Sequence, residues 1–285
     1  VYLMIRIVTD TTSGLPPEIS RRYNIPVIPQ VINFGNESYL EGIDMDNAYF
    51  MQRLRSSVEL PKTAAPPPEL FVEEFKKMVP VGDTILCIHP SAEVSGTVRS
   101  AIVAAQDFPG ADIRIIDTRT IGSPLATLVQ LAAEWAEAGH SADIIESRLN
   151  KMLTKSVIYF LVSSLEYLAK GGRIGGAAAL LGSVLQIKPI LIFNDGKVDQ
   201  FEKERTHRRA LARLKELVFA QAPHNGEAYL SVMHAAVPDL GKELADDICA
   251  EYNLPSIPIL DVPPAIVTHG GPGILAAAFF RSPAS

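Results

Sequence analysis

The sequence predicts an α/β protein with two domains, and three observations lead to this prediction. In the first half, a strand, a polar loop and a helix follow one another three times, which is typical of a three-layer α/β/α domain with a mostly parallel sheet. In the second half, hairpins alternate with helices, which is typical of a two-layer α/β domain with a largely antiparallel sheet. The chain has 285 residues, more than one domain usually holds. We expect domains at 1–140 and 141–285.

Composition and charge narrow the class of protein. Hydrophobic residues make up 47% of the chain, enough for a large core, and the net charge of −6 argues against nucleic acid as a partner of the whole molecule. Cys87 and Cys249 lie in apolar or helical stretches, so we expect core residues of a reduced, cytoplasmic protein. No cluster of Cys and His has metal-ligand spacing, and we expect neither a metal nor a cofactor. The apolar stretch at the start is too short for a membrane span and lacks the features of a signal peptide.

The first strand–loop–helix unit opens with a β-branched, apolar run at 3–8. It ends in the polar turn 9–14, and the proline pair that follows starts a helix. Asp10 and Thr12 lie at the carboxyl end of this strand, where open α/β sheets bind their ligands. For Asp10 we favour a role in holding the loop through hydrogen bonds to backbone N–H groups.

The segment between the first two units predicts irregular structure. Prolines interrupt the strand region 25–34, which we expect at the edge of the sheet. Residues 36–42 indicate a hairpin-like turn, and Asp44 is a suitable N-cap for a helix at 45–56. The proline-rich stretch 60–69 is expected to be an extended loop.

The second unit, at 83–106, is the stretch around which we expect the site to form. Residues 84–88 indicate a buried strand and residues 97–106 an amphipathic helix. Ser95 and Gly96 therefore lie at a helix start, where unpaired N–H groups and the helix dipole favour a bound anion. Serine at a helix start is most often an N-cap, and this role is compatible with anion binding.

The third unit, a strand at 112–116 and a long helix to about 138, closes the first domain. The second begins with a helix at 142–155, a strand at 157–162 and a short helix at 165–170. The glycine cluster 171–176 lacks the dinucleotide-binding fingerprint and the Lys-Ser/Thr of a P-loop. A tight turn between helices explains it better, with Arg173 pointing outward and an apolar helix at 177–185.

The rest of the second domain predicts a hairpin with a turn at Asp195-Gly196, a basic helix at 205–220, and a strand, a helix and a strand at 226–262. The last stretch predicts a strand at 265–267, a loop with His269, and an apolar helix ending at 280. This order would repeat that of 83–106. A lone histidine is usually a core residue, but the glycines beside His269 argue against tight packing on every side.

Several motifs occur together in one order along the chain: TDTTSGLPPE, KTAAPPPE, SAEVSGTVRSA, LEYLAKGGRIG, QIKPIL with its following DG turn, and THGGPG. On these motifs the sequence resembles the DegV family of bacterial fatty-acid-binding proteins, whose better-studied members are the lipid-binding subunits of a fatty acid kinase. The resemblance covers essentially the whole chain. It implies a long-chain fatty acid in a cleft between the two domains, presented to a kinase catalytic subunit that phosphorylates its carboxylate, and it allows transient contact with a membrane surface.

The resemblance also implies the residues of the site. Thr63, Ser95, Gly96, His269 and Gly270 would bind the carboxylate. Arg173 and Arg205 would lie near the mouth of the pocket or on a surface that docks the kinase. Family members commonly have Ser and Gln after the loop threonine, whereas this chain has Ala64 and Ala65, so one donor is lost.

Two other functions stay open at this point. One is an acyl hydrolase or transferase that uses Ser95 and His269, although neither a Gly-x-Ser-x-Gly motif nor an obvious acid for the histidine is present. The other is a binder of a different amphiphile with no kinase partner. The segments 177–185 and 275–280 are candidate walls of an acyl tunnel, and the preferred chain length is left open.

Overall fold

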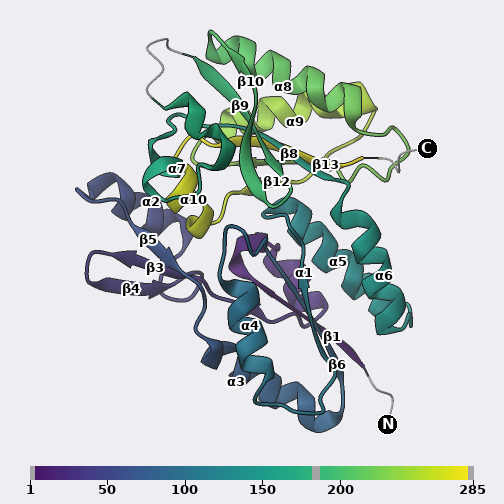
Figure 1. Cartoon of the computed structure of the whole chain (residues 1–285). Coiled ribbons are helices and arrows are strands. Elements are labelled where there is room, and N and C mark those ends of the chain that lie inside the picture. Colours follow the sequence, from purple (N-terminus) through teal and green to yellow (C-terminus); the bar gives the residue numbers. More distant parts are fainter. Residues whose placement is uncertain (1–3, 182–186, 282–285) are drawn as a thin grey trace.

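The computed structural model describes residues 4–181 and 187–281. Figure 1 shows two α/β halves, each built on its own sheet, with the N-terminal half below the C-terminal half. The predicted fold class is confirmed. Helix α6 (Ala142–Leu153), which the sequence assigns to the second domain, packs against α5 (Ser123–Glu137) and shares the apolar core of the first sheet.

The first sheet is parallel throughout. It is the middle one of three layers, with helices on both faces, as expected. Its strand order is β2-β1-β6-β7. Helices α5 and α6 cover one face, together with the short α1 (Pro17–Arg22), and two further helices cover the other (Figure 1). The strands are β1 (Ile5–Asp10), β2 (Val27–Ile28), β6 (Thr84–His89) and β7 (Ile113–Asp117), and the helices of the second face are α3 (Pro68–Met78) and α4 (Thr97–Ala105).

The alternation of side chains along β6 shows why this sheet is buried on both faces. Ile85 and Cys87 pack with the aromatic residues of α3, whereas Leu86 and Ile88 pack with the apolar face of α5. A strand that is apolar at every position can be satisfied only when helices cover both sides.

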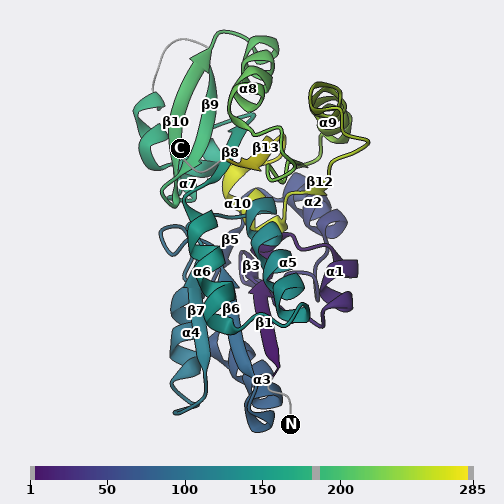
Figure 2. The same cartoon turned by 90° about the vertical axis from the view of Figure 1, so that its right-hand side faces the viewer.

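The second sheet has the order β10-β9-β8-β13-β11-β12 and is antiparallel except for its β11–β12 pair. Helices α8 (His207–Gln221) and α9 (Pro238–Tyr252) pack on its outer face. Its other face is turned toward the first half (Figure 2). The strands are β8 (Ser156–Leu161), β9 (Lys188–Asn194), β10 (Lys197–Glu204), β11 (Ser231–His234), β12 (Ile259–Asp261) and β13 (Leu275–Phe280).

A small third sheet was not predicted. The strands β3 (Val31–Phe34), β4 (Glu37–Leu40) and β5 (Lys62–Ala64) are antiparallel to one another. The expected turn at 36–42 is therefore largely a strand, and the expected loop at 60–69 contains one. Prolines flank β5 without entering it, so its three residues can still pair with β3.

Helix α2 (Asn47–Ser56) starts two residues later than predicted. Asp46 caps it by accepting a hydrogen bond from the backbone N of Tyr49. The expected cap, Asp44, instead accepts from the backbone N of Leu40 and closes the turn before the helix. Both aspartates have the chemistry of an N-cap, and the sequence alone does not rank them.

The prediction for the end of the chain was wrong, because the helix and the strand are interchanged. Residues 264–270 form helix α10 (Pro264–Gly270), and residues 275–280 form the central strand β13. Proline at the first position favours a helix start, and every residue of β13 is buried. A short, uniformly apolar run has no period that separates a buried strand from a helix.

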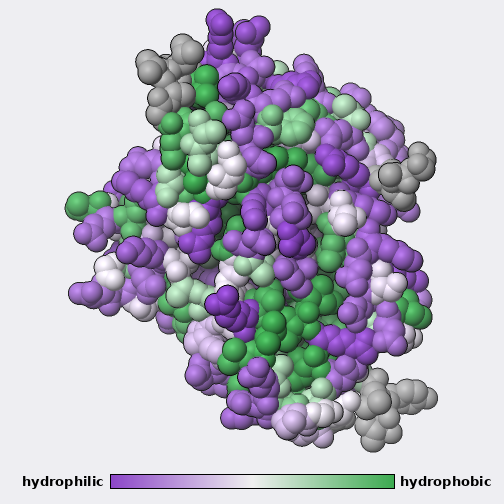
Figure 3. All heavy atoms as spheres, in the orientation of Figure 1, coloured by the Kyte–Doolittle hydropathy of each residue, from purple (hydrophilic) through white to green (hydrophobic). Residues whose placement is uncertain are grey.

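The glycine cluster leads from α7 (Glu166–Lys170) into the 3₁₀ helix η3 (Gly175–Leu180), which ends sooner than the predicted helix 177–185. Residues 182–186 of that prediction lie outside the described residues. Figure 3 shows hydrophobic residues gathered over α4 and its neighbouring strand on one face of the molecule. Two residues of α4, Ile102 and Val103, are about half exposed.

Candidate ligand-binding cavity

An apolar cavity lies between the two halves. Its walls come from loops of the first half and from the inner face of the second sheet, and α10 lies along it. Small-molecule sites commonly lie at an interface between domains, as this cavity does.

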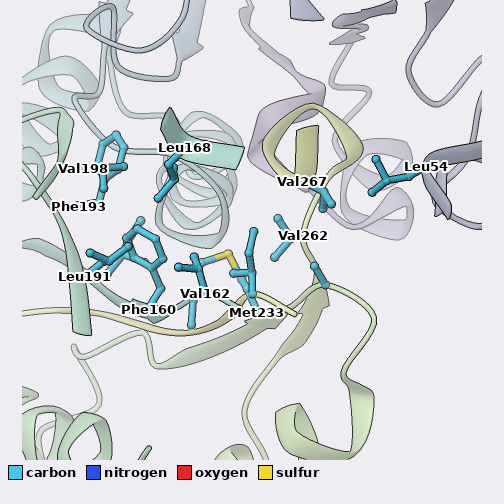
Figure 4. Close-up of a cluster of buried hydrophobic side chains, with 14 of the residues drawn as sticks. Leu54, Phe160, Val162, Leu168, Leu191, Phe193, Val198, Met233, Val262 and Val267 are labelled. Carbon is cyan, nitrogen blue, oxygen red and sulfur yellow. The ribbon is translucent and has the colours of Figure 1, made fainter. Parts of the chain in front are cut away.

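Most of the wall is hydrophobic. Phe160 of β8, Phe193 of β9 and Met233 of β11 lie around the same space as Leu168 of α7 (Figure 4). Alternation along β8 turns Ile158 and Phe160 toward the cavity and Tyr159 toward α8, on the outer face. Of the two predicted tunnel walls, 275–280 contributes Ala276, as part of a strand and not of a helix.

Polar side chains gather at one end of this cavity. They come from six separate segments of the chain, which the fold brings together. The residues are Thr12, Gln30, Thr63, Ser95, Arg173 and His269.

Thr63 and His269 are 206 positions apart in the sequence and are in direct contact. Thr63 Oγ1 lies 2.7 Å from His269 Nε2. Thr63 is the middle residue of β5, and His269 lies in the last turn of α10. The predicted pair is therefore brought together, although neither residue lies in the kind of element that was expected.

The imidazole of His269 is neutral at physiological pH. Burial lowers the pKa of His269 to about 4, and the positive charge of Arg173 acts in the same direction. His269 Nδ1 is buried without a hydrogen-bond partner among the described residues, and the ring packs against Gly171, where a Cβ would lie 2.4 Å from Nδ1. A neutral imidazole can hydrogen-bond to an anion but contributes no charge.

Arg173 supplies the positive charge, and the prediction that it points outward was wrong. It lines the cavity, where its Nε donates to the backbone oxygen of Val94 and its Nη1 to that of Gly171. These two bonds hold the guanidinium across the gap between the two halves. In the described part of the chain no carboxylate forms an ion pair with Arg173.

Ser95 lines the cavity just before α4, as the position of the helix start predicts. The helix cap itself is Gly96, and Ser95 Oγ accepts from the backbone N of Thr97 at 3.3 Å. Gly96 lies beside the cavity, in a surface hollow that shares Val94, Ser95 and Arg173 with it.

Asp10 holds the loop after β1, as we favoured. Its Oδ1 accepts from the backbone N and the hydroxyl of Thr12 at 3.0 and 2.6 Å, and its Oδ2 lies 2.8 Å from His89 Nδ1. The prediction missed Gln30, which follows a proline in an irregular strand region and carried no recognisable signal.

The other predicted site residues lie at different places. Gly270 lines the cavity. Arg205 is exposed and directly follows the last residue of β10. At the other end of this strand, near the cavity, its first residue Lys197 forms an ion pair with Glu93. Since a strand rises about 3.3 Å per residue, Arg205 lies roughly 25 Å along the strand from this pair. Ala64 and Ala65 do not line the cavity. The hydrogen-bond donor that these alanines lack is therefore not missing from the cavity wall.

The described residues offer neither a metal site nor a membrane-spanning helix. They contain no group of three or more His, Cys, Asp and Glu residues placed to bind a metal ion. No helix among them is both long and apolar enough to cross a membrane.

Comparison with known proteins identifies the family. The family model described as "Uncharacterised protein, DegV family" matches residues 4–282. A DegV domain-containing protein of Halalkalibacterium halodurans is 33% identical over 277 residues, which covers 97% of this chain and 98% of that protein. One of Streptomyces coelicolor is 36% identical over 273 residues, covering 95% and 96%. The chain belongs to the DegV family.

Solved DegV structures share the whole fold of this family member. A DegV family protein of Thermus thermophilus, described by its fatty acid binding, superposes with a TM-score of 0.90 at 28% identity, covering 98% of this chain and all of that one. A fatty acid binding DegV family protein of Streptococcus agalactiae also gives 0.90, at 27% identity over 99% of this chain and 100% of that one.

Proposed function

We propose that this DegV protein binds a long-chain fatty acid in the cavity between its halves. The observation that carries the proposal is the division of the cavity into a long apolar wall and one polar end. Each buried CH₂ of an acyl chain contributes about 0.8 kcal/mol, so the tail supplies most of the affinity. The fatty acid binding of the two structural neighbours supports the same assignment.

The polar end suits a carboxylate head group. Thr63, Ser95 and His269 offer hydrogen-bonding groups, Gly270 lies beside them, and Arg173 offers a positive charge. A buried carboxylate needs several donors or a charge, because otherwise it takes up a proton. This set provides both without a metal ion.

We further propose that the bound acid is presented to a kinase, which phosphorylates its carboxylate. The surface hollow that includes Arg99 and Gly96 adjoins the polar end of the cavity. The half-exposed Ile102 of α4 lines the same hollow, and Figure 3 shows hydrophobic residues gathered over α4. An apolar surface with basic residues beside the head group is suited to a partner that must reach this end of the ligand.

The hydrogen bonds around Ser95 and His269 do not favour the hydrolase alternative. Ser95 Oγ bonds to Thr97, and His269 Nε2 bonds to Thr63. His269 Nδ1 has no acidic partner among the described residues to orient the ring as a general base.

Native mass spectrometry of the purified protein tests the binding proposal. We expect a co-purified long-chain fatty acid that is replaced by added hexadecanoic acid. Mixing the loaded protein with a candidate kinase and ATP should then yield acyl phosphate. An empty cavity that takes up no fatty acid, or ester hydrolysis abolished by Ser95→Ala, would contradict the proposal; Ser100→Ala, in α4 outside the cavity lining, is the matched control.

A further inference from the structure

Behind the polar end of the cavity, buried side chains form a continuous hydrogen-bonded chain from Asp10 to Ser95. Asp10 and Thr97 are fully buried, and Gln30 is 3% exposed. Gln30 Nε2 lies 3.0 Å from Asp10 Oδ1 and 2.8 Å from Thr97 Oγ1. Thr97 Oγ1 in turn lies 2.8 Å from Ser95 Oγ. Gln30 and Ser95 line the cavity, whereas Asp10 and Thr97 lie behind them.

The carboxylate of Asp10 sets the direction of the first bonds. A carboxylate can only accept hydrogen bonds, so each of its neighbours must donate. The NH₂ group of the Gln30 amide therefore faces Asp10, as do the N–H groups of Thr12 and His89. The second hydrogen of the Gln30 amide then goes to Thr97 Oγ1. Thr97 thus accepts from Gln30 and keeps its own proton for one further partner.

Ser95 is the partner for that proton. Among the described residues, the side chains hydrogen-bonded to Thr97 Oγ1 are those of Gln30 and Ser95. If Ser95 donated instead, the Thr97 proton would be left without an acceptor at a fully buried position, which is unfavourable. Ser95 Oγ also accepts from the backbone N of Thr97. With two bonds accepted, Ser95 has its own proton free for the cavity.

We infer that Asp10, Gln30 and Thr97 are positioning residues that turn the hydroxyl proton of Ser95 toward the cavity, so that the site selects head groups that accept hydrogen bonds. This inference concerns the head-group site proposed above and rests on the proposal that the cavity binds a fatty acid. A donor already oriented before the ligand arrives loses no rotational freedom on binding. A carboxylate benefits fully from it, whereas a primary alcohol can turn to donate or accept and benefits little.

A double-mutant cycle tests this inference. Thr97→Val removes the hydroxyl at nearly constant volume, and Thr97→Ser keeps it. The ligands are hexadecanoic acid and hexadecan-1-ol, titrated into delipidated protein with and without Ser95→Ala. We expect Thr97→Val to weaken binding of the acid by about fivefold, the size of one ordinary hydrogen bond. Binding of the alcohol should change by less than about twofold, and Thr97→Ser should restore binding of the acid.

The decisive comparison is made in the Ser95→Ala background. In that background Thr97→Val should not weaken binding of hexadecanoic acid any further, because the Ser95 hydroxyl that Thr97 orients is absent. An equal loss with and without Ser95, or an equal loss for acid and alcohol, would show that Thr97 acts only through packing and would overturn the inference while leaving the proposed function intact. If the unmodified protein binds neither lipid, the proposed function itself fails. Should Thr97→Val not fold, Thr97→Ala enters the same cycle.

Discussion

An ionisable side chain lies at each end of helix α10, and of the two Glu41 is buried and His269 is partly buried. At its start, the carboxylate of Glu41 accepts hydrogen bonds from the backbone N of Ala265, at 2.9 Å, and from the hydroxyl of Thr11. His269 lies in its last turn. Burial raises the pKa of Glu41 to about 7 and lowers the pKa of His269 to about 4. Burial disfavours the charged form in both cases, which moves an acid and a base in opposite directions.

These two groups make opposing contributions to the pH dependence of stability. Between pH 4.5 and about 7, the folded state holds a proton on Glu41 that the unfolded state has lost, so this contribution decreases as the pH rises. Between about pH 4 and pH 6.5, the unfolded state protonates His269 and the folded state does not, so this contribution decreases as the pH falls. Each amounts to about 3 kcal/mol over its window, and the two nearly cancel where the windows overlap.

We predict that removing either group by substitution makes the pH dependence of stability due to the other one measurable. For Glu41→Gln, the free energy of unfolding should be about 3 kcal/mol lower at pH 4 than at pH 7, because of the two groups only His269 still titrates. His269→Asn should instead gain stability as the pH falls from 7 to 4.5. Urea unfolding across this range measures both slopes, with the exposed Glu18→Gln as control. Parallel curves for all variants would contradict the assigned pKa shifts.

His269 is also the residue with which we test the head-group site. We predict that His269→Ala weakens binding of hexadecanoic acid by about tenfold or more, because a hydrogen bond to a charged group is lost. The fold should persist, since the ring lines a cavity and does not fill a core. Isothermal titration and circular dichroism measure the two effects, and His207→Ala, at an exposed position on α8, is the control. Unchanged affinity would remove His269 from the site.

At the scale of elements, the glycine cluster works through close backbone approach and not through a nucleotide. Gly175 has a φ of +51°, and a Cβ there would lie 2.0 Å from the backbone oxygen of Val198 in β10. Gly172 has a φ of +69° but open space around its Cβ position. Of these two glycines, Gly175 therefore carries both a conformational and a packing constraint, and Gly172 carries only the first.

This difference gives a matched pair of variants. Gly172→Ala should cost about 1 kcal/mol, which is the cost of a left-handed backbone conformation for alanine. Gly175→Ala should cost several times more, because β10 or η3 must move as well. Thermal unfolding of the two variants compares them directly. Similar melting temperatures would contradict the close approach of η3 to β10.

Two elements show why sequence patterns failed locally. The run at 275–280 is apolar at every position, and only its pairing with β8 and β11 makes it a central strand. The run at 62–64 has only three residues and lies between prolines, and only its pairing with β3 makes it a strand. Both depend on partners far away in the sequence, which no local window contains.

At the scale of the whole molecule, the cavity exists because two sheets meet across it. The hairpin turn between β9 and β10 helps to hold the halves together. Arg119 pairs with Asp195 at 2.7 Å, and Ser91 donates to the backbone oxygen of Gly196 at 2.8 Å. The division of the chain between residues 140 and 141 stays a prediction.

The shape of the cavity should limit the ligand. Ala276 is a small residue of β13 that lines the cavity. We predict that Ala276→Leu, which fills part of the space, weakens binding of octadecanoic acid at least about tenfold more than binding of dodecanoic acid, since each excluded CH₂ costs about 0.8 kcal/mol. Competition in native mass spectrometry measures the ratio. An equal loss for both acids would place Ala276 away from the tail.

The sequence by itself determined the class of both sheets, the helix start at Ser95, the family, and most of the residues at the polar end of the cavity. These follow from local periodicity, from turn chemistry and from motifs, all of which can be read within a short window. Only the tertiary structure decided that Thr63 contacts His269, that Arg173 turns inward, and that Gln30 links Asp10 to Ser95 through Thr97. Such contacts join segments up to 206 positions apart, and they depend on how the two sheets pack and not on the residues nearby in the chain.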